Sequence, residues 1–360
     1  MERRKILEEV YVEYLASSLG PTTAAELSRL SNGALSHDQI TRALAGEEHG
    51  SRELWAVVKP LVRKRSLADE QRGAVVSIDD TIILKPHSDE SEVIGWYFDH
   101  TENRCVKGVN LVTLFWESNP AGAGGPVRLP VGYEVVRKDP PQEPGGRATV
   151  RVDKNTLVRG LLRQAKANGV PFETVLSDCW FASEETLEMI HHELGSRFVF
   201  ALKGNRLAVP VDENRRQAKW KRLTELGLEE DCARVVWLRG LSFPVAVVRH
   251  RYRNVDGSVV DVFLCTNDVE LSAEQILTLQ KRRWSIEVYH KSLKQNAGAA
   301  RAPLWSVRTL LNHLWASLCA YVRWERLKLR KNLNHFALKA KIRLAAQKRA
   351  LEAFRELSNA

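Results

Sequence analysis

The sequence predicts an α/β protein, because strand and helix patterns alternate in the middle of the chain. An apolar strand at residues 174–178 is followed by a helical pattern at 183–194 and a second strand at 198–203. Strands separated by a helix of this length pair in parallel within one sheet. The chain has 360 residues, 44% of them apolar, which allows a large core and about two domains, or one domain with large insertions.

Further strands are expected before this unit. Residues 74–79, 96–98 and 109–116 are apolar runs of strand length, and together they suggest a strand meander. A helical pattern at 156–169 follows and closes on Gly169. We therefore expect a mixed sheet flanked by helices.

The segment at residues 204–270 interrupts this alternation. It is polar and β-rich, and its apolar runs suggest antiparallel strands in a β-rich insertion. A helix is expected to begin near Ser272, a capping residue, and to run through Glu287. Residues 310–329 have the pattern of another amphipathic helix.

Residues 1–65 show helical patterns. Two short patterns flank Asn32 and Gly33, and the second begins at Ser36 with Gln39 three residues later, which is a capping box. A helix, a tight turn and a helix outline a DNA-reading motif. An ordinary helical hairpin has the same outline, so both interpretations stay open.

Positive charge is concentrated near the C-terminal end. The chain has 54 Lys and Arg against 44 Asp and Glu, a net charge of +10 and a pI near 9.4. Residues 321–350 contain one acid, Glu325, and ten basic residues: Arg323, Arg326, Lys328, Arg330, Lys331, Lys339, Lys341, Arg343, Lys348 and Arg349. Such a concentration favours a polyanionic partner.

The five cysteines are scattered, without a C-x-x-C pair or a Cys/His cluster at zinc spacing. We expect them to be reduced thiols. The N-terminus lacks a signal-peptide pattern, and no stretch reaches the roughly 18 apolar residues of a membrane span. These observations predict a soluble, cytoplasmic protein.

Acidic residues follow two of the expected strands. Asp79 and Asp80 close the strand at 74–79, Asp178 closes the strand at 174–178, and Glu287 lies on a later helix. Polar groups after strands of such a sheet face a common crevice, although an Asp there is also a common start to a loop. Carboxylates without Cys or His partners suit Mg²⁺ or Mn²⁺, and two such ions about 4 Å apart promote phosphodiester displacement.

Two basic residues flank Glu287 on the expected helix. Arg283 precedes it by four residues and Lys294 follows it by seven, so the three side chains share one helical stripe. A solvated surface with weak salt bridges is one interpretation. The other is a metal ligand between two phosphate-binding cations.

The order "SIDDT", "LSDCWF" and "RRWSIEVYHKSLK" resembles the DDE transposases of bacterial insertion sequences. It is most similar to the subgroup with a Y-x2-R-x3-E-x6-K motif and a β-rich insertion before the Glu. Arg283, Glu287 and Lys294 match that motif, whereas Gln280 occupies its tyrosine position. The role of that ring is then either missing or supplied by a neighbour such as Trp284 or Tyr289. The resemblance covers roughly residues 70–325.

This resemblance implies an RNase H-like fold and a magnesium-dependent transposase that binds double-stranded DNA. Asp79, Asp178 and Glu287 would hold two Mg²⁺ or Mn²⁺ ions. The family's first motif, D-x-[ST], favours Asp79 over Asp80 because Thr81 follows in register. Asp80 stays as the alternative first ligand.

The enzyme would cut at terminal inverted repeats and transfer the 3′-hydroxyl into target DNA, as a homodimer on DNA in the bacterial nucleoid. Two alternatives stay open: a structure-selective nuclease of the same fold, and a catalytically inactive DNA-binding relative. The expected division is a helical DNA-binding region (1–70), an RNase H-like catalytic domain (71–325, with the insertion at 204–270) and a basic helical tail (326–360).

Additional DNA contacts are expected around the acids. The lysine candidates each have an ordinary solvated alternative, and most of the ten tryptophans should be core residues. The candidates besides Arg283 and Lys294 are Lys107, Lys203, Trp284, Tyr289 and Lys291, with Trp305 as a further residue to test.

Overall fold

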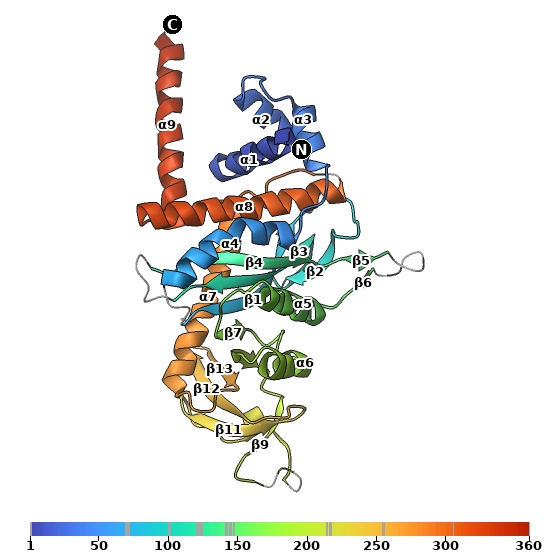
Figure 1. Ribbon diagram of the computed structural model, residues 1–360, viewed down its shortest axis with the longest axis vertical. Helices are drawn as coiled ribbons and strands as arrows, with labels where there is room; N and C mark the ends of the chain where they lie inside the picture. The colour runs from blue at the N-terminus through green and yellow to red at the C-terminus, as the bar shows by residue number, and fades with distance from the viewer. Residues whose placement is uncertain are drawn as a thin grey trace.

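A computed structural model describes residues 2–68, 73–99, 102–119, 125–140, 143, 146, 148–213, 215, 218–253, 256–304 and 306–359. Its centre is a mixed sheet with strand order β10-β9-β11-β12-β13-β8-β7-β1-β3-β2, and β4 pairs with β3 (Figure 1). The strands of this sheet are β1 (Val75–Leu84), β2 (Gly95–Asp99), β3 (Arg104–Glu117), β4 (Arg128–Val135), β7 (Thr174–Ser177), β8 (Arg197–Leu202), β9 (Leu207–Pro210), β10 (Lys221–Arg222), β11 (Ala233–Leu238), β12 (Val245–Arg253) and β13 (Val259–Thr266). A small separate ladder joins β5 (Lys138–Asp139) to β6 (Thr149–Val150).

Helices lie on both faces of the sheet and at both ends of the chain. They are α1 (Glu2–Ser17), α2 (Ala24–Leu30), α3 (His37–Leu44), α4 (Ser51–Ala68), α5 (Lys154–Ala167), α6 (Glu184–Glu188), a π-helical turn (Met189–Glu193), a 3₁₀ turn (Leu223–Glu225), α7 (Ala273–Gln295), α8 (Val307–Lys331) and α9 (His335–Asn359). The α/β class with a mixed sheet is confirmed, and it is consistent with an RNase H-like fold.

The parallel unit predicted in the middle of the chain is confirmed. β7 pairs in parallel with both β1 and β8, and α6 with its π-helical turn connects β7 to β8. β1 is longer than the sequence predicted, because β3 continues to pair with it in antiparallel fashion as far as Leu84. Asp79 and Asp80 therefore lie inside a strand, whereas Asp178 directly follows β7 as predicted.

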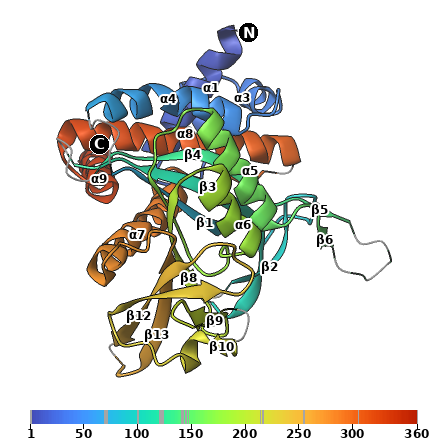
Figure 2. The ribbon, with the colours of Figure 1, turned by 60° about the horizontal axis from the view of Figure 1, so that its bottom comes forward.

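The antiparallel strands predicted in residues 204–270 are also confirmed. β13 pairs with β8, and β12, β11 and β9 continue outward from it, so this segment extends the central sheet. Figures 1 and 2 place these strands at the end of the molecule opposite the N-terminal helices. A second apolar cluster, with Val75, Leu264 and Ile276 among its members, packs the sheet here against α7.

The helical pattern at the N-terminus is confirmed in detail. Ser36 Oγ accepts a hydrogen bond from Gln39 N (3.3 Å) and Gln39 Oε1 accepts one from Ser36 N (3.1 Å), so the predicted capping box begins α3. Asn32 and Gly33 both have positive φ, which gives the tight turn between α2 and α3. α1 and α3 pack against α8.

Two further findings concern the cysteines and the hydropathy of the helices. None of the five cysteines forms a disulfide. Among the described residues, no helix combines the length and the apolar character that crossing a membrane requires.

Candidate active site

Asp79, inside β1, and Asp178, directly after β7, occupy equivalent places along neighbouring strands. The parallel pairing of β1 with β7 ends at Ser77 opposite Leu176, and Asp79 and Asp178 each stand two residues beyond that pair. Neighbouring strands lie about 4.8 Å apart, so the register alone brings these two carboxylates to one edge. This proximity follows from the parallel topology, which the sequence predicted.

Helix α7 brings Glu287 to the same edge. Ser272 caps α7 as predicted, because Ser272 Oγ accepts from Gln275 N (3.3 Å) and Gln275 Oε1 accepts from Ser272 N (2.9 Å). Apolar side chains of α7, including Ile286 and Leu293, are buried beneath it. The adjacent stripe of the helix therefore faces β1.

Arg283 lies between the two acids that this packing brings together. Its Nη1 is 3.5 Å from Asp79 Oδ2 and 3.4 Å from Glu287 Oε1. The side chain of Asp79 is 13% exposed, whereas that of Glu287 is 40% exposed. The site is thus partly open on the Glu287 side.

Burial and neighbouring negative charges disfavour the ionised form of Asp79. Burial raises the pKa of Asp79 well above its usual range, the charges of Glu287 and Asp178 raise it further, and the Arg283 guanidinium opposes them. Burial also raises the pKa of Asp178, although its Oδ1 accepts a hydrogen bond from Trp180 N (2.9 Å). Converging carboxylates of this kind are stabilised by a cation.

A third donor, which sequence reasoning missed, belongs to this group. Asp79, Glu287 and His290 each offer one donor atom, and these three atoms lie within 4.8 Å of one another. His290 is buried, and its Nε2 has no hydrogen-bond partner among the described residues. Burial, together with the charges of Lys294 and Arg283, lowers the pKa of His290 to about 3, so the ring is neutral. Two carboxylates and a neutral imidazole fit a divalent cation.

Family comparisons agree with this geometry. A model described as a DDE superfamily endonuclease matches residues 2–225, which is more than half of the chain. The chain belongs to this family. A second model, described as a transposase DDE domain, matches residues 148–323. Together the two matches support a DDE transposase, and both families imply metal-dependent chemistry on DNA. No curated protein matches the chain.

Asp80 lies apart from the group formed by Asp79, Glu287 and His290. Its Oδ1 accepts from Lys154 Nζ of α5 (2.9 Å) and its Oδ2 accepts from Asn110 Nδ2 of β3 (2.6 Å). Successive residues of a strand point to opposite faces, so Asp79 faces α7 and Asp80 faces α5. Among the described residues it is Asp79, not Asp80, whose carboxylate lies with the donor atoms of Glu287 and His290.

The basic candidates differ in accessibility. Lys294 is partly buried; burial lowers its pKa, and the charges of Asp99 and Glu287 oppose that shift. Lys291 and Trp284 are exposed on α7. The ammonium of Lys203 lies 4.1 Å from the centre of the Trp180 ring, and that of Lys107 lies 5.9 Å from the centre of the Trp96 ring.

Tyr289 is a core residue, which corrects its assignment as a DNA contact. It is 1% exposed, stacks on Phe115 at 4.6 Å between ring centres, and its hydroxyl lies 3.4 Å from Thr113 Oγ1. Trp284, the other aromatic candidate on α7, is 65% exposed. Trp305 lies outside the described residues.

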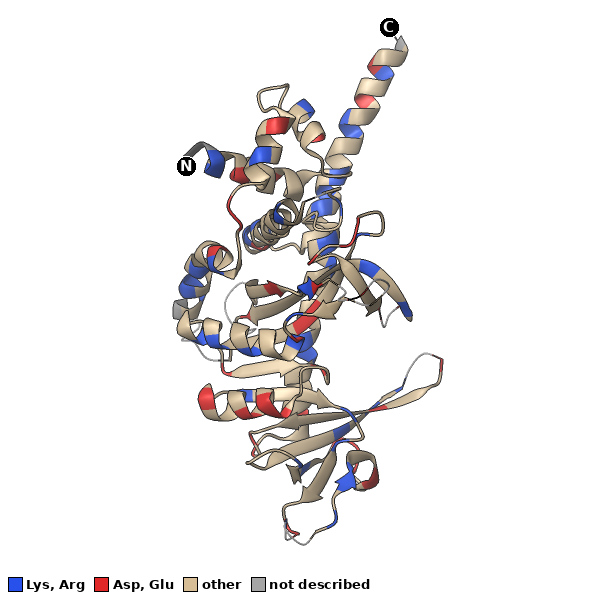
Figure 3. Cartoon of the chain, turned by 90° about the vertical axis from the view of Figure 1, so that its right-hand side faces the viewer, with Lys and Arg blue, Asp and Glu red and all other residues tan. Residues whose placement is uncertain are grey.

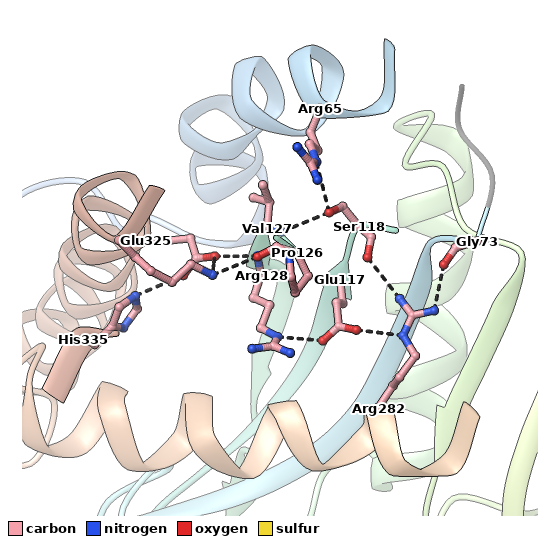
Figure 4. Close-up of polar contacts among 11 residues, drawn as sticks. Arg65, Gly73, Glu117, Ser118, Pro126, Val127, Arg128, Arg282, Glu325 and His335 are labelled. Carbon is pink, nitrogen blue, oxygen red and sulfur yellow. Dashed lines mark hydrogen bonds and ion pairs between the residues drawn. The ribbon is translucent and has the colours of Figure 1, made fainter. Parts of the chain in front are cut away.

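A buried ion pair that the sequence did not reveal fixes α7 on the sheet. Arg282 Nε donates to Glu117 Oε1 of β3 (2.7 Å), and the Arg282 guanidinium also donates to the carbonyls of Gly73 (2.8 Å) and Ser118 (3.1 Å) (Figure 4). The other oxygen of Glu117 accepts from Arg128 Nε (2.6 Å). Because Arg282 precedes Arg283, these bonds set the position of the stripe that carries Glu287.

Proposed function

We propose that the protein is a transposase that cuts DNA at the terminal inverted repeats of its own element and joins the 3′-hydroxyl to target DNA. The observation that supports this proposal is that Asp79 lies beside Glu287 and Arg283 and is close enough to Asp178 for the charge of Asp178 to raise its pKa. In this proposal the three carboxylates hold two Mg²⁺ or Mn²⁺ ions. Bound metal would activate the attacking oxygen and neutralise the leaving oxygen.

The residues of the chain supply positioning. Asp79 and Glu287 bind from opposite sides, one from a strand and one from a helix, and His290 adds a nitrogen donor. Arg283 contacts both carboxylates. When a metal cation binds these carboxylates, the Arg283 guanidinium becomes available for a DNA phosphate. Lys294 binds a phosphate farther along α7, and Lys107, Lys203, Lys291 and Trp284 contact the surrounding DNA.

The larger organisation completes the proposal. The helical region at 1–70 reads the element's ends, residues 71–325 form the RNase H-like catalytic domain with 204–270 as its insertion, and 326–360 form a basic tail. A homodimer holds one end per subunit. We also propose that the chain belongs to the subgroup with the R-x3-E-x6-K motif, found in bacterial insertion sequences; Arg283, Glu287 and Lys294 stand at the spacing of that motif.

A strand-transfer assay tests this function directly. Linear DNA that carries the segments flanking the coding sequence is incubated with the protein, Mg²⁺ and a target plasmid. Flank DNA covalently joined to the plasmid through its 3′ end is the expected product. Cleavage of branched DNA without joined product would instead favour a structure-selective nuclease, and binding without any cleavage would favour an inactive relative.

Lys294→Ala should weaken DNA binding and flatten its salt dependence. A phosphate contact contributes about 0.9 to the slope of log K against log salt, so losing one contact lowers that slope by about one unit. Lys281→Ala removes an exposed lysine from the same helix and serves as the control. Fluorescence anisotropy across a salt series measures both slopes, and an unchanged slope for Lys294→Ala would remove this residue from the DNA contacts.

His290→Ala should weaken Mn²⁺ binding by roughly ten- to hundredfold, as for other groups that support a metal site. The reason is the loss of the nitrogen donor within 4.8 Å of the carboxylate donors. Electron paramagnetic resonance of free Mn²⁺ gives the dissociation constant without a cleavage assay. His192→Ala, which removes a solvent-exposed imidazole of the turn after α6, is the control; equal affinities of the two variants would contradict a role for His290.

A further inference from the structure

A groove of about 570 Å³ lies where the C-terminal end of α7 meets α9 and the segment that follows α1. Four cationic side chains line it: Lys294, Arg301, Lys339 and Arg343. No acidic side chain is among its described lining residues. A concave surface with four cations and no anion attracts a polyanion strongly, because its walls concentrate the field of the cations.

Two of the four cations of this groove, Lys339 and Arg301, are held by neutral partners. Lys339 Nζ donates to the carbonyls of Ala16 (2.7 Å) and Ser18 (2.6 Å), and Arg301 Nη1 donates to Ser18 O (2.9 Å). These carbonyls orient the side chains without cancelling their charge. The site is therefore organised in advance for an anion, which lowers the entropy cost of binding one.

Burial and the charges of neighbouring cations lower the pKa of two side chains in this groove. Burial lowers the pKa of Lys339 to about 8, and the charges of Arg301 and Arg343 add to the effect. Burial also lowers the pKa of Arg301, with Arg343 as a further cause. A bound phosphate would relieve this repulsion.

The first turn of α9 is fixed against its neighbours, so the groove has a defined shape. His335 Nε2 lies 3.0 Å from Glu325 Oε2 of α8 (Figure 4). His335 Nδ1 lies 3.0 Å from Ser292 Oγ of α7. Glu325 is buried and also accepts from Arg128 N (2.7 Å). Beyond this turn α9 extends away from the body, with Lys and Arg along it (Figure 3).

We propose that this groove binds backbone phosphates of the DNA that is cut at the carboxylate site. Lys294 lines the groove and lies seven residues after Glu287 on α7, a distance of about 10 Å along the helix axis. Base pairs rise about 3.4 Å each, so the groove lies roughly three base pairs from the scissile phosphate. This inference rests on the proposed DNA substrate, and it adds Arg301, Lys339 and Arg343 to the path of that DNA.

Arg343→Gln tests the groove with little risk to the fold, because Arg343 is exposed on α9. Arg349→Gln is the matched control, since it removes the same charge from the same helix outside the groove lining. Anisotropy of a short labelled duplex in EDTA is measured from about 50 to about 200 mM salt. Arg343→Gln should lower the salt slope by about 0.9 and weaken binding roughly eightfold at 0.1 M salt, while Arg349→Gln matches wild type.

Two outcomes would overturn the inference. One is an equal effect of the two substitutions on the slope. The other is a groove that binds free phosphate instead of DNA. In that case inorganic phosphate would raise the melting temperature of wild type more than that of Arg343→Gln. The salt slopes of duplex binding would then be equal for the two proteins. Because binding is measured in EDTA, a protein that never joins DNA strands can still show the expected slopes, and a functional transposase can still fail them.

Discussion

Asp79→Asn should abolish Mg²⁺-dependent cleavage of element-end DNA while leaving duplex binding close to that of wild type. Asp79 is the strand residue of the group whose donor atoms lie within 4.8 Å of one another, and an amide cannot replace its charge toward a cation. Metal stabilisation of the transition state amounts to several kcal/mol. A loss of about 4 kcal/mol lowers the rate roughly 1,000-fold, which single-turnover cleavage assays measure.

Asp80→Asn is the matched control, because it makes the same change one position along the same strand. Asp80 is paired with Lys154 and Asn110 on the other face of β1, so cleavage should persist. Asp178→Ala should behave like Asp79→Asn. Cleavage by Asp79→Asn at the wild-type rate, or equal losses in Asp79→Asn and Asp80→Asn, would contradict the assignment of the site.

The electrostatics of the site predict that loss of cleavage in Asp79→Asn does not come from unfolding. The pKa of Asp79 is raised, so its ionised form is less stable in the folded than in the unfolded chain. This penalty grows as the pH rises through the raised pKa, and the neutral Asn side chain escapes it. In EDTA at neutral pH, Asp79→Asn should therefore melt no lower than wild type.

Local signals in the sequence were sufficient for much of the fold. Ser36 and Ser272 mark the starts of α3 and α7 because a capping hydroxyl satisfies N–H groups within its own turn. The strand before Asp178 was also predictable from a local signal, because β7 is a short apolar run between turn residues. The end of β1 was not, because its later half is held by pairing with β3, which lies far along the chain.

The residues of the candidate site were likewise only partly predictable from the sequence. The stripe of Arg283 and Glu287 follows from helical spacing, and His290 lies on it three residues after Glu287. Its place near the carboxylates could have been considered from that spacing alone. Which side of α7 is buried depends on how the helix packs on the sheet, so the burial of Tyr289 and the exposure of Trp284 required the structure. The partner of Arg282 also comes from a distant strand.

Glu117→Leu should destabilise the protein by about 3–5 kcal/mol, the usual cost of removing one partner of a buried ion pair. The side chain of Glu117 is 2% exposed and that of Arg282 is 15% exposed. Without Glu117, the bonds that the Arg282 guanidinium keeps within the described part of the chain are those to the carbonyls of Gly73 and Ser118. Urea denaturation measures the loss. Glu102→Leu, which breaks an exposed pair with Arg104, should cost less than about 1 kcal/mol.

A double variant separates the pair from the packing around it. Glu117→Leu combined with Arg282→Met replaces both charges with apolar groups of similar length, and such replacements are often nearly neutral. The double variant should therefore be more stable than Glu117→Leu alone, with a coupling energy of about 0.5–3 kcal/mol between the two sites. Strictly additive losses would mean that Glu117 acts through Arg128 instead. In that case Arg282 would contribute to the position of α7 only through the backbone carbonyls, and Glu287 would be held in place without help from β3.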